Sequence, residues 1–256
     1  MISHRLDLTL PGGVEARVLF TSRGGAASGG SSRSPYAWAN LGSHVGDDPA
    51  AVVANRRALA EALGVPASAM TFMHPDHGRG VAAVSEPTGV APGAEIASVD
   101  ALVTATAGIG LVALAADCVP VILVDPVAGV VAAVHSGWRG LALDVVGAAV
   151  GQMEASGARA QDVAALLGPA ICGRCYPVPE ARAQEVAKVR PEALTTAPDG
   201  QPALDLRAGL SARLAELGAT VTLVGACTAE DPGMYSHRRD GLTGRQGAAV
   251  AIVAAA

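Results

Sequence analysis

Residues 99–140 read VDALVTATAGIGLVALAADCVPVILVDPVAGVVAAVHSGWRG. Short apolar runs in this stretch are separated by Gly, Asp or Pro, which is the pattern of consecutive buried strands. The predicted strands span residues 99–104, 111–116, 121–124 and 130–134. Residues 107–124 form the longest apolar stretch of the chain, but Asp117 and Pro120 interrupt it. A membrane span needs about 20 mostly apolar residues without such breaks, so we expect two buried strands here.

Strands and helices alternate on both sides of this stretch. Residues 6–10 and 16–20 predict a hairpin, and residues 49–63 predict a helix that Asp47 or Asp48 caps and Gly64 ends. Further strands are predicted at 70–73, 163–167, 221–224 and 248–253, helices at 141–155, 179–189 and 206–217, and a mobile loop at 24–35. The spacing lacks the regularity of a βαβ series, so we expect a mixed-sheet α/β or α+β fold.

The composition narrows the class of protein. The 256 residues include 18 Lys+Arg and 23 Asp+Glu, and half of the residues are hydrophobic, so a large core can form around one domain, residues 1–256. The net charge of −5 argues against a nucleic-acid partner, whose phosphates attract a basic face. The first ten residues show no secretory signal, so we expect a soluble, cytoplasmic protein without a membrane partner. The oligomeric state is left open.

Cys118 and His135 are the first candidate functional pair. Each lies at the end of a predicted strand, 17 residues apart, with a turn at Asp125-Pro126 between them. That spacing suits adjacent strands, which would place the thiol and the imidazole at the same end of the sheet. A Cys and a His in this position can be zinc ligands or a nucleophile and its base. A buried structural Cys and a capped His are the alternative.

A third donor follows the predicted strand at 70–73, in the sequence His74-Pro75-Asp76-His77. Either histidine could be a metal ligand, and Asp76 could orient one of them. Histidines near a turn are also often merely solvated. Together with Cys118 and His135, however, a third N donor makes a three-ligand zinc site with an open fourth position.

Two further motifs contain residues that could bind a metal or an anion. Cys172 and Cys175 form a Cys-x-x-Cys, but a zinc ribbon needs a second such pair and the chain has none. Nearby prolines also disfavour a thioredoxin-like helix start, so we expect a loop. The turn from Tyr235 to Gly241 contains a His and two Arg, and it is either solvated or an anion clamp, because Arg binds phosphate bidentately.

Several blocks in one order resemble the YfiH family of laccase-domain proteins, which are labelled polyphenol oxidases and regarded as purine nucleoside enzymes. The blocks are Asn40–Pro49, His77-Gly78, Ala116–Val121, His135–Gly140, Gly168–Ile171 and Ser236–Gly241. They extend from Asn40 to near the C-terminus. The Ala-Asp-Cys and His-Ser-Gly-Trp-Arg-Gly blocks are specific in combination.

The resemblance implies a zinc site made by His77, Cys118 and His135. It also implies phosphorolysis of adenosine, inosine and S-methyl-5′-thioadenosine, with adenosine deamination as a second activity, on layered mixed sheets with flanking helices. Purine nucleosides and phosphate would then be the small-molecule partners. The family usually has Gln-Val-His-Gly where this chain has Pro75-Asp76-His77-Gly78, so His74 is a competing ligand. Copper is the less favoured metal.

The expected roles follow from this combination. Cys118, His135 and Arg139 are the expected catalytic residues, and Asn40, Arg139 and Arg238 are the expected substrate contacts. The alternative is a metal-free hydrolase that cleaves amides in cell-wall precursors, with Cys118 as nucleophile and His135 as base. A copper laccase is rejected, because it needs more imidazoles than the six histidines present. A non-enzymatic binding module is disfavoured, since the reactive residues cluster at strand ends.

Overall fold

The computed structural model describes residues 1–25 and 29–255, and within them the chain forms two six-stranded mixed sheets and a two-stranded one. The strand order of the first sheet is β1 (Ile2–Leu10), β2 (Val14–Thr21), β14 (Gln246–Ala254), β7 (Gly110–Ala115), β3 (Met70–His74) and β5 (Ile96–Ala97). The order of the second is β13 (Thr220–Leu223), β10 (Ala164–Leu167), β8 (Val119–Asp125), β9 (Val130–Ser136), β6 (Ala101–Thr104) and β4 (Val81–Ala83). The small sheet pairs β11 (Leu194–Thr196) with β12 (Pro202–Leu204).

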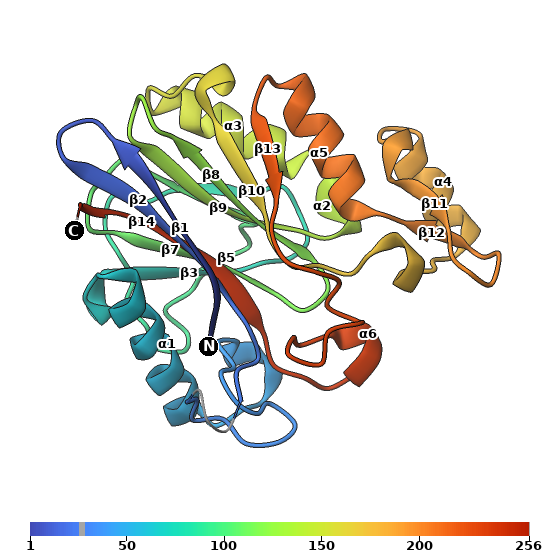
Figure 1. Cartoon of the computed structure of the whole chain (residues 1–256), viewed down its shortest axis with the longest axis horizontal. Coiled ribbons are helices and arrows are strands. Elements are labelled where there is room, and N and C mark those ends of the chain that lie inside the picture. Colours follow the sequence, from blue (N-terminus) through green and yellow to red (C-terminus); the bar gives the residue numbers. More distant parts are fainter. Residues whose placement is uncertain (26–28, 256) are drawn as a thin grey trace.

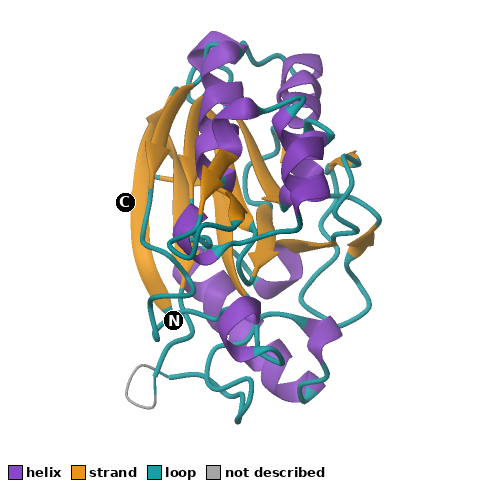
Figure 2. Cartoon of the chain, turned by 90° about the vertical axis from the view of Figure 1, so that its right-hand side faces the viewer, coloured by secondary structure: helices purple, strands orange, loops and turns teal. Residues whose placement is uncertain are grey.

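Helices cover the outer faces of the two large sheets. The α-helices are α1 (Pro49–Leu63), α2 (Trp138–Ala142), α3 (Val145–Ala155), α4 (Glu180–Ala187), α5 (Leu206–Glu216) and α6 (His237–Asp240). Single 3-10 turns are η1 (Ser43–Val45), η2 (Ala67–Ala69), η3 (Ala160–Asp162), η4 (Gly173–Cys175) and η5 (Pro191–Ala193). Helix α1 packs on β2 and β14 of the first sheet, whereas α3 and α5 pack on the second (Figures 1 and 2). The result is a helix–sheet–sheet–helix stack.

Three apolar clusters hold these layers together. One joins α1 to the first sheet, one lies between the two sheets, and one joins the second sheet to its helices. Neighbouring residues of a strand therefore enter different clusters, as Leu19 and Phe20 of β2 do. Because the central strands β7, β8 and β9 are buried on both faces, their sequences are nearly continuous apolar runs rather than alternating ones. This explains the pattern of residues 99–134.

Most predicted elements are present. The hairpin forms from β1 and β2, and the middle strands are β6, β7, β8 and β9. Helix α1 has the predicted bounds: the Asp48 carboxylate accepts a hydrogen bond from the Ala50 N–H at 2.9 Å, and Gly64 ends the helix at φ 83°. In the predicted loop 24–35, the described residues form neither helix nor strand, and residues 26–28 lie outside the described part of the chain. The mixed α/β layers agree with the predicted fold class.

The helix predicted at 141–155 is wrong in its first turn. The chain forms α2 up to Ala142, turns at Asp144 with φ 62°, and begins α3 at Val145. The Asp144 carboxylate caps α3 by accepting a hydrogen bond from the Gly147 N–H, and it also binds the Arg213 guanidinium at 2.8–2.9 Å. A side chain that caps a new helix in a left-handed conformation interrupts the old one. No helix within the described residues has the length and apolar character needed to cross a membrane.

Candidate metal centre and substrate cavity

Three segments bring the predicted donor residues together. Strands β8 and β9 are antiparallel neighbours in which Pro120 lies opposite His135, so Cys118, just before β8, is at the same end as His135. This is the arrangement expected from their spacing. His77 comes from the loop after β3, which belongs to the other large sheet. The site therefore lies where the two sheets meet.

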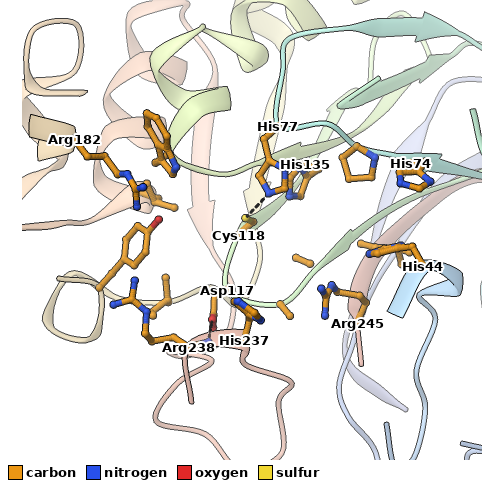
Figure 3. Close-up of a pocket in the computed structure, with 18 residues that line it drawn as sticks. His44, His74, His77, Asp117, Cys118, His135, Arg182, His237, Arg238 and Arg245 are labelled. Carbon is orange, nitrogen blue, oxygen red and sulfur yellow. Dashed lines mark hydrogen bonds between the residues drawn. The ribbon is translucent and has the colours of Figure 1, made fainter. Parts of the chain in front are cut away.

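His77, Cys118 and His135 form a compact donor group, named here the metal centre. One donor atom from each lies within 4.8 Å of the others, and Cys118 Sγ is 3.8 Å from His77 Nε2 (Figure 3). The two imidazole rings are perpendicular, with centroids 4.8 Å apart. Zinc bonds of about 2.0–2.3 Å at tetrahedral angles would separate an N and an S ligand by about 3.6 Å. The 3.8 Å between Cys118 Sγ and His77 Nε2 is close to this value, so the three residues could hold a metal ion.

Asp100 holds both histidines of the metal centre. Its carboxylate is 2.9 Å from His135 Nδ1, which leaves His135 Nε2 to face the other donors. The same carboxylate accepts hydrogen bonds from the backbone N–H groups of His77 at 3.1 Å and Gly78 at 2.7 Å. Asp100 is fully buried. Such a carboxylate–histidine pair fixes the tautomer and direction of a metal-ligating imidazole.

The electrostatics of Cys118 and His135 are strongly linked. Burial opposes ionisation of the Cys118 thiol, but His135 and His77 outweigh it and lower the pKa of Cys118 to about 6. Burial likewise disfavours the imidazolium, but the Cys118 thiolate and Asp100 raise the pKa of His135 to about 9. Near pH 7 the thiol is therefore a thiolate, the form that binds metals or attacks electrophiles.

The backbone around the metal centre is unusual in ways that its sequence explains. His77 and Asp117 both have left-handed backbone conformations, with φ of 61° and 87°. Non-glycine residues in that region are uncommon and concentrate at functional sites. Gly137 follows β9, and a Cβ there would lie 3.0 Å from both Cys118 Sγ and His77 Cδ2. Only glycine lets this turn approach the donors, which accounts for the Gly of His-Ser-Gly-Trp.

The metal centre opens into a cavity of about 490 Å³, a size that accommodates a small-molecule ligand. On one side, two arginines stack on aromatic rings (Figure 3). The Arg182 guanidinium lies 4.8 Å from the Trp138 ring centre, and that of Arg238 lies 5.0 Å from the Tyr176 ring centre. Stacking fixes each guanidinium while leaving edge N–H groups for an anion.

His44, His74 and Arg245 line the other side of the cavity (Figure 3). The His44 and His74 rings lie 5.3 Å apart. Burial, reinforced by the charge of Arg245, lowers the pKa of His44 to about 4, so His44 is neutral near pH 7. Among the described residues, His74 does not join the donor group of His77. His74, the alternative ligand suggested by the sequence, therefore lies in the cavity wall and outside the metal centre.

Asp117, beside Cys118, connects the cavity wall to the second sheet. Its carboxylate accepts hydrogen bonds from the Arg238 N–H at 2.6 Å and the Thr228 hydroxyl at 2.7 Å. The backbone carbonyl of Asp117 accepts another from the Ile171 N–H at 3.0 Å. These bonds place the Arg238 turn against the metal centre. They give the predicted turn at 235–241 a defined position beside the cavity.

Two expected substrate contacts lie elsewhere. Arg139 is exposed on α2 and does not line the cavity, because the preceding residue, Trp138, occupies the face of the helix that does. Asn40 is fully buried, and its side chain is engaged by Gly42, Asp47 and the Arg245 backbone N–H at 2.8–3.0 Å. Asn40 thus supports the segment that carries Arg245 and does not face the cavity. Arg238 lines the cavity as expected.

The sequence arguments missed Asp100, Arg182 and Arg245. Asp100 directly precedes a four-residue buried strand. A single carboxylate there does not by itself indicate a functional site. Its contact with His135 becomes visible only in the folded structure. Arg182 lies on α4, which reads as an ordinary surface helix. Arg245 follows the turn at 235–241 and directly precedes β14. Its place at the end of a predicted strand, like that of Cys118 and His135, could have marked it as a candidate site residue.

Comparisons with known proteins identify the family of this chain. The family model described as multi-copper polyphenol oxidoreductase laccase matches residues 17–253. A relative named purine nucleoside phosphorylase ORF3, from Streptomyces griseus, is 47% identical over 246 residues, 96% of either chain. The crystal structure of YlmD from Geobacillus stearothermophilus aligns with TM-score 0.84 and 31% identity, over 97% of this chain and 99% of that one.

The crystal structure of YfiH from Bacillus licheniformis aligns with TM-score 0.85 and 28% identity, over 92% of either chain. The likeness thus covers both large sheets and the segments that carry the metal centre. The chain belongs to the multi-copper polyphenol oxidoreductase laccase family, the YfiH family that its motifs indicate.

Proposed function

We propose that this protein is a zinc-dependent purine nucleoside phosphorylase. It converts adenosine, inosine and S-methyl-5′-thioadenosine to the free base and the corresponding ribose 1-phosphate, and it deaminates adenosine as a second activity. The proposal is supported by the relatives named purine nucleoside phosphorylase. The observation that carries it is a cavity in which three arginines surround a three-donor metal centre: Arg182, Arg238 and Arg245.

His77, Cys118 and His135 would hold the zinc ion. Three protein ligands with an open fourth position are typical of catalytic zinc. When bound, zinc supplies a Lewis acid that stabilises negative charge on an atom it contacts. A blue-copper site also uses two His and one Cys but adds a weak axial ligand such as Met, and no methionine is among the described residues that line the cavity. Zinc is therefore the favoured metal.

Arg238 and Arg182 are the proposed phosphate ligands. Phosphorolysis requires phosphate to attack C1′ of the ribose while the glycosidic bond breaks and its electron pair leaves with the purine. Guanidinium groups bind phosphate oxygens in pairs and hold them for this attack. Arg238 is fixed by its Nη1–H bond to the Pro177 carbonyl at 3.0 Å and by its ring stacking on Tyr176. In a protein of net charge −5, this local positive wall favours an anionic substrate.

We also propose a cytoplasmic location. Cys118, Cys172, Cys175 and Cys227 form no disulfide bond in the described structure. Reduced cysteines are characteristic of reducing compartments, whereas exported proteins usually form disulfides.

The products formed with and without phosphate test the proposal. Each nucleoside is incubated with the zinc-loaded protein, and base and sugar phosphate are separated by chromatography. We expect base and ribose 1-phosphate only when phosphate is present, and inosine from adenosine in either buffer. Base release at the same rate without phosphate would mean hydrolysis and would contradict the phosphorylase assignment.

A metal-free cysteine hydrolase is the second candidate, and the linked charges of Cys118 and His135 favour it. A thiolate beside an imidazolium is the resting state of a nucleophile and its acid–base partner. His77 argues the other way, since a third donor is needed by a metal and is superfluous for the pair. Activity that survives a chelator but is abolished by alkylation of Cys118 would select the hydrolase; loss of activity on chelation and recovery with zinc would exclude it.

A further inference from the structure

A second group of three potential metal ligands lies outside the cavity. In the loop after β10, Cys172 directly precedes η4 and Cys175 is its last residue, and Cys227 lies in the loop after β13. One donor atom from each is within 4.8 Å of the others, the same limit that the metal centre meets. Cys227 is buried and the other two are half-buried, and none of the three lines the cavity. We name these residues the thiol cluster.

Backbone pairing brings the cysteines of the thiol cluster together. Strands β10 and β13 are parallel neighbours, and their pairing continues beyond the strands as a bridge between Ala170 and Cys227. The Thr228 N–H donates to the Ala170 carbonyl at 3.1 Å, and the Cys172 N–H donates to Cys227 Sγ at 3.3 Å. Cysteines separated by 55 residues are therefore held side by side.

The chemistry of the thiol cluster suits a tetrahedral thiolate site. Zinc–sulfur bonds of about 2.3 Å place neighbouring sulfurs about 3.8 Å apart, so sulfurs within 4.8 Å need only a small closure. A carboxylate lies beside one of the three sulfurs: Cys175 Sγ is 3.7 Å from Glu230 Oε1, although Glu230 is outside the group of mutually close donors. Arg174 binds the same oxygen at 2.7 Å, so Glu230 would turn from Arg174 toward the other two sulfurs to become a ligand. Thiolate donors select zinc over magnesium or calcium.

We propose that Cys172, Cys175 and Cys227, with Glu230 as fourth ligand, bind a second zinc ion that has a structural role. The ion would cross-link the loop after β10 to the loop after β13. Both loops contact Asp117: Ile171 through its N–H and Thr228 through its hydroxyl. The cross-link therefore supports the cavity wall beside Cys118 without touching the substrate. This site is independent of the phosphorylase proposal, because it is defined by metal content alone.

Metal stoichiometry tests the site with matched variants. Full-length protein is purified with a thiol reductant, loaded with zinc, desalted and analysed by mass spectrometry of its metal. We expect two zinc ions per wild-type chain, one in Cys175→Ser, one in Cys118→Ser and none in the double variant. The two single variants each remove one thiol, so each controls for the other. A Cys175→Ser protein that binds as many ions as the wild type would overturn the proposal.

A second measurement on the wild type covers the case in which Cys175→Ser does not fold. Zinc-loaded protein is treated with N-ethylmaleimide, and modified cysteines are mapped by peptide mass spectrometry. We expect Cys172, Cys175 and Cys227 to be protected with zinc and modified once a chelator has removed it. Equal modification in the two states would contradict the site. So would a disulfide among these cysteines that persists under reductant.

Discussion

The metal centre and the thiol cluster are alike in construction and differ in access. Each gathers three donors from segments far apart in sequence, with donor atoms within 4.8 Å, and backbone hydrogen bonds position both. The metal centre faces a cavity of about 490 Å³, whereas no cysteine of the thiol cluster lines it. Three protein ligands beside open space are typical of catalytic zinc, and a full set of four is typical of structural zinc. On the two proposals above, the surroundings of each group, more than its donor atoms, would distinguish a catalytic zinc ion from a structural one.

The two groups also differ in charge. At the metal centre, two imidazoles offset one thiolate, and the pKa of Cys118 falls to about 6. In the thiol cluster, burial and the neighbouring sulfurs of Cys172 and Cys227 raise the pKa of Cys175 to about 12. Cys175 is thus protonated near pH 7 where Cys118 is ionised, whereas the pKa of Cys172 is lowered, because hydrogen bonds with Cys227 and Cys175 outweigh its burial.

Removing the thiolate of the metal centre has the largest expected effect. Cys118→Ala deletes a ligand, so we expect loss of its zinc and a fall in phosphorolysis of about a thousandfold or more, since a catalytic metal contributes several kcal/mol. Cys118→Asp can still coordinate through oxygen and should keep part of both. Metal analysis and steady-state kinetics measure the two losses. A Cys118→Ala enzyme with wild-type turnover would remove the metal centre from the reaction.

Alkylation of the metal-free protein compares the two thiols directly. At pH 7.5 we expect iodoacetamide to modify Cys118 about a hundredfold faster than Cys175, because thiolate fraction outweighs the lower nucleophilicity of the more acidic thiol. A lowered pKa means that the thiolate persists above about pH 6 and is lost below it, so the Cys118 rate should fall as pH drops through 6. Peptide mapping over time gives both rates, and the unfolded protein is the control. Equal rates in the folded protein would refute the contrast.

The sequence brought Cys118 and His135 together but not the cysteines of the thiol cluster, for a physical reason. His135 lies on β9 and Cys118 directly precedes the antiparallel β8, so 17 residues and one turn were enough to place them together. Cys227 reaches Cys172 through a parallel pairing, whose long connection leaves no local pattern. For this reason the sequence did not show that Cys227 lies beside the Cys-x-x-Cys of Cys172 and Cys175.

Helix geometry and burial explain why two predicted substrate contacts do not line the cavity. Arg139 belongs to the His-Ser-Gly-Trp-Arg-Gly motif, but on the short helix α2 it points away from the cavity that Trp138 lines. Asn40 has the polar side chain expected of a substrate contact, yet its bonds stabilise a buried turn. The layered fold itself was predictable, since nearly continuous apolar strands require cover on both faces.

Loss of the Asp100 charge should have the next largest effect. Asp100→Asn keeps the shape but weakens the bond that orients His135, so we expect zinc affinity at the metal centre to fall about 10–100-fold. The thiol cluster has no contact with Asp100 and should keep its affinity. Competition with a chromophoric chelator resolves the two sites. Equal weakening of both would indicate general unfolding instead of a local effect.

The smallest expected effect is on the KM for phosphate, which should respond to replacement of Arg238 but not of Arg139. Arg238→Ala removes a guanidinium from the cavity, and we expect the KM for phosphate to rise about tenfold, in line with the loss of one charge-assisted hydrogen-bond contact. Arg139→Ala is the matched control, because Arg139 is exposed and outside the cavity, and its KM for phosphate should change little. Phosphate titrations at saturating nucleoside measure both. The reverse order would restore Arg139 as the phosphate ligand.

Anomalous X-ray scattering from a crystal of the zinc-loaded protein shows directly whether zinc binds at the metal centre. Data collected on either side of the zinc absorption edge locate zinc and distinguish it from copper. We predict an anomalous peak bonded to His77, Cys118 and His135 at about 2.0–2.3 Å from each donor atom. A zinc-loaded crystal with no peak among these three residues, or a protein purified with copper there instead, would contradict it.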